Sequence, residues 1–176
     1  DGTALGSASL EWSDLFLADG AVINFGSDQD VTLTHVADVG LRLKSVATAD
    51  DKPIVLTLQT GETDIAASDV LGKIEFQAPD EGTGTDAILV AAHIAAISEG
   101  DFSASNNATK LSFATGASEA ASEKMSLSSA GVLTTSSNIV SGGTITGGGL
   151  LTTGGNIVIP NAGTIGSAGD TDAIAI

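Results

Sequence analysis

The chain has 176 residues, enough for one or two small domains, and its hydrophobic residues (42%) include many alanines. The formal net charge is −16, and the 6 basic residues are scattered among 22 acidic ones, which argues against nucleic-acid binding. The absence of cysteine excludes disulfides and cysteine-based metal sites, and no apolar run approaches the ~20 residues that cross a membrane, so we expect no membrane insertion.

Large apolar side chains are too few to give a single chain a strong core. The sequence has 5 phenylalanines, one tryptophan and no tyrosine. Each fully buried leucine or isoleucine contributes roughly 1.5–3 kcal/mol, whereas ordering the backbone of one residue costs about 1–2 kcal/mol. We therefore expect an obligate oligomer, in which several chains share apolar surface.

Alternation of apolar and polar residues predicts strands along most of the chain. Ala21, Ile23 and Phe25 share one face of the first predicted strand, and Val31, Leu33 and His35 share one face of the second. Further strands are predicted near residues 54–59, 74–77, 111–113 and 125–127. Turn signals separate these runs, at residues 19–20, 26–27, 61, 79–82 and 105–107.

Three segments are less regular. Residues 11–17, behind a capping residue at Ser9, and the alanine-rich residues 118–124 are candidates for short helices. Residues 88–97 are predicted to form a strand that is buried on both faces, because their large apolar residues form no helical stripe.

The composition changes after Met125, where lysine, arginine and glutamate disappear and glycine becomes frequent. The sequence LTTSSNIV at residues 133–140 returns as LTTGGNIV at residues 151–158. A repeat with spaced β-branched residues favours a repetitive β-shaft, with a flexible linker as the alternative. The motif GTALGSA at residues 2–8 also resembles GTIGSA at residues 163–168. This similarity indicates tandem copying, and we expect the chain to continue into a further repeat.

Several motifs resemble those of phage tail-fibre proteins. LGSASLEWSDLFLADGAVINFG, residues 5–26, is similar to the fibre repeat "LGS…W-x-DLYL-x-x-G", with Phe16 where tyrosine is common. FGSDQDVTLTHVADVGLRL, residues 25–43, resembles the continuation of that repeat in fibres of marine phages.

Residues 72–131 resemble the fibre module that often precedes an intramolecular-chaperone domain. The pattern of that module is "G-x-I-x-F…A-x-I-x-A…L-x-F-x-T…E-x-M-x-I-x-x-x-G". Its positions are occupied here by Gly72, Ile74, Phe76, Ala92, Ile94, Ala96, Leu111, Phe113, Thr115, Glu123, Met125, Leu127 and Gly131. Lys124 stands where arginine is frequent, and the chaperone domain itself is not among these residues.

The resemblance implies a structural segment of a tail fibre on the virion, outside the cell, that positions a host-receptor-binding tip. The expected fold is all-β: an elongated, intertwined homotrimeric fibre with a β-sandwich or prism-like module and a glycine-rich repetitive β-shaft. We expect an N-terminal fibre repeat at residues 1–50, a β-rich module at 51–131 and the shaft at 132–176. The expected partners are two further copies, other virion proteins and a host receptor bound through another region.

No arrangement of residues predicts catalysis, so we expect no enzyme, no cofactor and no catalytic or metal site. His35 and His93 are most simply packing histidines, although in a trimer either could meet its symmetry mates around an ion or water. Asp28 and Asp30 have a D-x-D spacing but lack a calcium-loop pattern, so solvated turn acids are the simpler interpretation. The alternative functions are a receptor- or glycan-binding module, a capsid decoration protein and an extracellular filament subunit.

Overall fold

The structure is a computed structural model that describes residues 5–78 and 84–145. In these ranges the protein has eight strands in two antiparallel sheets and a single 3-10 turn, η1 (Asp86–Ile88). The predicted all-β class is confirmed. Most of the predicted shaft, including the second copy of the LTT repeat, lies outside the described residues.

The first sheet is a three-stranded meander. Its strands are β1 (Val22–Phe25), β2 (Val31–Val36) and β3 (Gly40–Ser45), in that order. Ile23 lies opposite Leu33, and Leu33 lies opposite Leu43. Because residues directly opposite each other project to the same side of a sheet, these three side chains share one face, as their alternation predicts.

The second sheet is a five-stranded meander. Its strands are β4 (Val70–Gln77), β5 (Val90–Ser98), β6 (Thr109–Thr115), β7 (Ser122–Leu127) and β8 (Leu133–Thr135). A row of opposite residues, Ile74, Ile94, Phe113 and Met125, crosses the first four strands. The sheet continues beyond Gly131 into β8, which contains the first copy of the LTT repeat.

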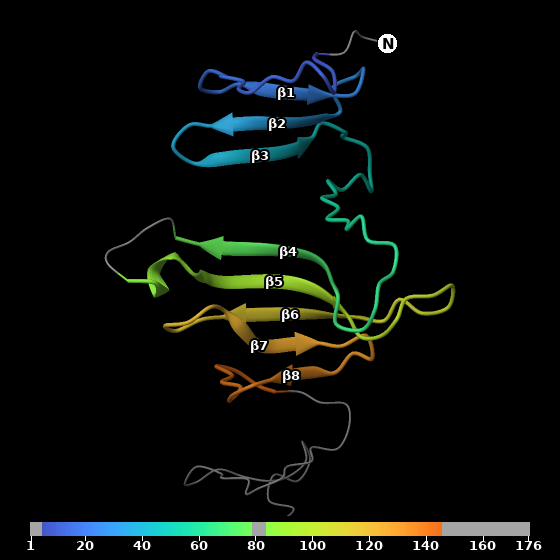
Figure 1. Cartoon of the computed structure of the whole chain (residues 1–176), viewed down its shortest axis with the longest axis vertical. Coiled ribbons are helices and arrows are strands. Elements are labelled where there is room, and N and C mark those ends of the chain that lie inside the picture. Colours follow the sequence, from blue (N-terminus) through green and yellow to red (C-terminus); the bar gives the residue numbers. More distant parts are fainter. Residues whose placement is uncertain (1–4, 79–83, 146–176) are drawn as a thin grey trace, which may run out of the picture.

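Both sheets are one layer thick. In Figure 1 the strands run across the long axis of the chain and follow one another along it in sequence order. Strands contact mainly their neighbours in sequence, and no described strand or helix covers either face of a sheet. Among the described residues the only buried apolar side chains are those of Ala95 and Ala114, each 2% exposed. The described part of one chain therefore has no conventional core.

Both short helices expected from the sequence are wrong. Residues 11–17 form no helix, because an isolated helix of seven residues is unstable without a surface to pack against. Residues 118–120 form bends and β7 begins at Ser122, because pairing with β6 outweighs the helix preference of alanine and glutamate. The strand expected at residues 54–59 is also not formed.

The strand expected at residues 88–97 is present as β5, although it is not buried on both faces. Ala95 is buried, whereas the neighbouring Ile94, on the opposite face, is 37% exposed. The single-layer sheet explains the difference, since only one face of β5 is shielded within the chain.

The turn between β6 and β7 gives a first prediction. A Cβ atom on Gly116 would overlap the carbonyl oxygen of Glu119, whereas a Cβ on Gly61 would meet nothing within 4 Å. Gly116→Ala should lower the free energy of unfolding by about 1–3 kcal/mol, because the turn backbone must shift. Urea denaturation should show no such loss for Gly61→Ala. Equal stability of the two variants would contradict the turn geometry.

Candidate self-association surface

One face of the second sheet is apolar and open to solvent. The register places eight large apolar side chains on it, and we call this set the apolar face: Ile74, Phe76, Ile94, Leu111, Phe113, Met125, Leu127 and Leu133. Six of the eight are more than one-third exposed, and Leu133 reaches 56%. The positions that carry the fibre-module resemblance, from Gly72 to Leu127, lie on this face with the exception of Glu123. The sequence pattern thus marks a surface that the single chain leaves uncovered.

The opposite face combines small buried residues with long charged ones. Ala95, Ser112 and Ser126 lie opposite one another on β5, β6 and β7, and Ser112 is only 1% exposed. Lys73 and Glu75 form an ion pair at 2.9 Å on β4, and Lys110 and Glu123 form one at 2.8 Å between β6 and β7. Long side chains lying over small ones shield this face without a second layer.

A bulge in β7 brings Glu123 to the charged face. Phe113 lies opposite Met125, but Ala114 lies opposite Glu123, so Lys124 is the extra residue. The hydrogen bond from the Lys110 ammonium is the main cause that lowers the pKa of Glu123, and the hydroxyls of Ser112 and Ser126 lower it further. Burial partly opposes this shift.

The first sheet has a smaller apolar face. It contains Ile23, Phe25, Val31, Leu33, His35, Leu41 and Leu43. Arg42 and Lys44 project to the other side, together with Thr32 and Thr34. Arg42 and Lys44 of the first sheet, like Lys73 and Lys110 of the second, thus lie on the face opposite the large apolar side chains.

The two histidines lie on different kinds of surface. His35 belongs to the apolar face of the first sheet, and its Nδ1 is 3.6 Å from Oδ1 of Asp19. His93 lies opposite Glu75 and Ala114, on the charged face of the second sheet. Among the described residues no three histidine, aspartate or glutamate side chains form a group that could hold a metal ion.

Asp28 and Asp30 lie in the turn between β1 and β2. Their Oδ1 atoms are 3.1 and 2.6 Å from the position that a Cβ on Gly26 would occupy. Both carboxylates therefore fold back over this glycine, whose φ of +82° suits a residue without a side chain. Two carboxylates fall short of the six to eight oxygens that calcium takes.

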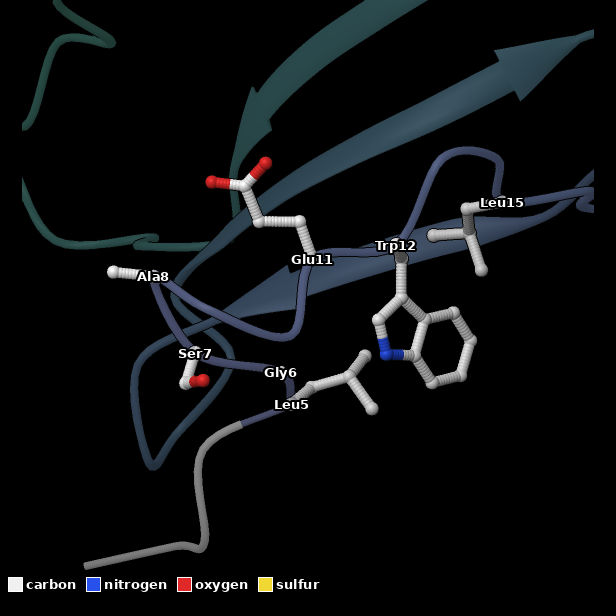
Figure 2. A pocket seen from close by; sticks show the side chains of 7 residues that line it. All are labelled: Leu5, Gly6, Ser7, Ala8, Glu11, Trp12 and Leu15. Carbon is white, nitrogen blue, oxygen red and sulfur yellow. The ribbon is translucent and has the colours of Figure 1, made fainter.

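A hollow of about 440 Å³ lies beside Trp12 near the start of the described chain (Figure 2). Ser7 and Leu10 exchange two backbone hydrogen bonds of 3.1 Å, and this tight turn brings the indole against Gly6. In Figure 2 the side chain of Leu5 faces the indole, whereas the Glu11 carboxylate points away from it. Trp12 is 60% exposed, so it is not a packing anchor within its own chain.

No known family model matches the chain, and no curated protein matches it. None of the described residues belongs to a helix long and apolar enough to cross a membrane. The arrangement of the two faces is therefore the main basis for a functional proposal.

The Glu123 network gives a second prediction. A carboxyl group whose pKa is lowered by folding stabilises the folded state above its unfolded pKa, and this contribution disappears as the pH falls through the folded pKa. Lys110→Met should raise the pKa of Glu123 and reduce the loss of stability in acid below about pH 4.3. The effect should stay below about 1 kcal/mol, because the pair is partly exposed.

Carbon-detected NMR titration of the glutamate carboxyl groups measures the pKa of Glu123 directly. Lys73→Met is the matched control, because Lys73 pairs with Glu75 instead. A Glu123 titration that Lys110→Met leaves unchanged would show that the ion pair has no effect on this carboxylate in solution.

Proposed function

We propose that this chain is a structural segment of a phage tail fibre, a virion appendage in which three copies associate through the apolar faces of their sheets. One observation carries the proposal: the second sheet exposes a face of eight large apolar side chains, six of them more than one-third exposed. Soluble monomers rarely leave such a surface uncovered, and contiguous apolar patches usually mark contact sites.

The distribution of charge supports association between identical copies. A formal charge of −16 makes two copies repel each other in general. On the second sheet, however, Lys73, Glu75, Lys110 and Glu123 all project away from the apolar face. Copies that meet through their apolar faces therefore keep these charges in water, where salt screens them.

The energetic scale is sufficient for assembly. Burying a half-exposed leucine or isoleucine contributes about 1 kcal/mol, half of the value for full burial. The eight side chains of the apolar face can therefore offset a large part of the roughly 4–15 kcal/mol that association costs in lost freedom. The apolar face of the first sheet adds to this total.

A three-fold arrangement fits the strand direction. Since the strands run across the long axis (Figure 1), three single-layer sheets can form the walls of a prism around an axis parallel to it. The apolar faces then point inward and the charged faces outward. The resemblance to fibre modules favours three copies over two, because two apolar faces could also close as a sandwich. The segment then acts as a stiff spacer, joined to other virion proteins and to a receptor-binding tip elsewhere.

Two adjacent residues test this proposal. Ile94 projects to the apolar face and His93 to the charged face of the same strand. Native mass spectrometry should give three times 17.3 kDa for the unaltered chain and for His93→Lys. Ile94→Lys should give a monomer, because assembly would bury an unpaired ammonium group. A folded, monodisperse monomer of the unaltered chain would refute the proposal, and a mass of twice 17.3 kDa would refute the three-fold arrangement.

Glycan binding is the second candidate function, and the exposed indole of Trp12 favours it. Sugar rings stack on aromatic faces, and this chain has one tryptophan, so its fluorescence reports on that site alone. If the hollow binds sugars, titration with a panel of bacterial surface saccharides should shift the emission maximum, and Trp12→Leu should abolish retention on a glycan array. No response to any saccharide would leave Trp12 as a contact residue between chains.

A further inference from the structure

Residues 54–59, IVLTLQ, have the sequence of a strand but not its hydrogen bonds. Apolar residues alternate along most of the segment, Pro53 precedes it, and Gly61 follows it. None of its backbone groups forms a hydrogen bond with the backbone of another described residue. Both sides are exposed, with Val55 at 69% and Leu56 at 68%. Such a segment is a hazard for aggregation unless it pairs with another strand.

The segment lies beside the apolar faces of the two sheets. Ile54 and Val55 line a hollow together with Val31 and Leu43 of the first sheet. Leu58 lies against Gly72 of β4, where a Cβ atom would come within 2.9 Å of the Leu58 Cβ. The segment therefore occupies the side of each sheet on which the proposed interface between copies forms.

Hydrogen bonds just after the segment hold the chain away from its own β4 edge. The carbonyl of Ile65 accepts from the amide of Phe102 at 2.9 Å, and the amide of Ser68 donates to the carbonyl of Ser98 at 3.0 Å. The amide of Asp69 donates to the Ser98 hydroxyl at 2.9 Å. These bonds fix residues 65–69 beside the end of β5 and the loop that follows it, so the preceding chain crosses the face of β4 instead of forming a hairpin with it.

The edge of β4 is open to a partner. β4 is the terminal strand of its sheet and pairs with β5 on one side alone, as far as the described residues show. It has eight residues, long enough for a six-residue strand to pair along it. Unpaired N–H and C=O groups along such an edge are a template for an added strand.

We propose that residues 54–59 become a strand by pairing with the free β4 edge of a second copy of this chain. This inference rests on the proposed self-association and specifies one of its contacts. A second copy is the occupant favoured by charge, because no charged residue lies between Lys52 and Glu62, whereas most other surfaces of two copies repel. A contact between a segment of one copy and a different site on the next copy is head-to-tail, and such contacts close into a ring when the rotation between copies is a whole fraction of a turn, as in a trimer.

Residue-resolved hydrogen exchange tests the pairing. In the assembled protein, alternate amides of residues 54–59 should exchange at least about a hundredfold more slowly than in the monomeric Ile94→Lys variant. The alternate amides of β4 that β5 does not engage should slow in parallel. Protection of every second amide is diagnostic. A strand that pairs along one edge has hydrogen bonds at alternate amides, whereas burial without pairing gives no such alternation.

Proline substitutions provide an independent readout. The amides of Val55 and Leu56 point to opposite sides of an extended segment, so only one of them can bond the β4 edge. Replacing that residue with proline removes the bond, so one of Val55→Pro and Leu56→Pro should weaken assembly at least about tenfold. The other variant should weaken it less. Thr48→Pro is the control, because Thr48 lies in the same connection and its amide forms no hydrogen bond with a described residue.

Each outcome decides between the two proposals. An oligomer with period-two protection supports both. An oligomer in which residues 54–59 exchange as an unstructured chain overturns the strand pairing and leaves the proposed function intact. Protection that persists in a folded monomer overturns the strand pairing, because the partner then lies within the same chain. If the unaltered chain itself is a monomer, the proposed function fails, and the strand pairing fails with it.

Discussion

A β-sheet one layer thick has two faces, and a chain without a second layer can shield at most one of them by itself. The remaining features of this protein follow from that constraint. On the second sheet, the face shielded within the chain has alanine and serine at its centre, because long lysine and glutamate side chains can lie over small residues. The other face has leucine, isoleucine and phenylalanine, which only another protein surface can cover.

The two faces of the second sheet have different roles: the charged face stabilises the sheet of a single chain, and the apolar face is the one proposed to drive association. The ion pairs and the buried serines of the charged face depend on contacts within one sheet, so they are available before any second copy arrives. In the proposed assembly, the apolar face contributes its full hydrophobic free energy only when copies meet. If the copies associate as proposed, the stability of the folded chain depends on protein concentration, as it does for obligate oligomers.

Much of the fold could be predicted because period-two alternation is a strong signal in this sequence. Ile23, Leu33, Ile74 and Phe113 lie on the faces that their spacing indicates. The signal fails where long-range pairing decides the outcome. Ser122 and Glu123 have good helix formers before them, yet they pair with β6. No sequence pattern announces the bulge at Lys124 that turns Glu123 toward Lys110.

The connection at residues 54–59 shows how a wrong prediction can still be informative. Alternation describes what a segment prefers when a neighbouring strand is present, and it does not say which chain supplies that neighbour. The partners of β2, which are β1 and β3, lie within a few residues before and after it, so the preference is met locally. At Leu56 the same preference is unmet, because residues 65–69 are hydrogen-bonded to the end of β5 and the loop after it and draw the chain across the face of β4. Residues 54–59 thus lack a partner strand within the single chain. The apolar faces remain exposed for the same reason, because one chain supplies no second layer to cover them.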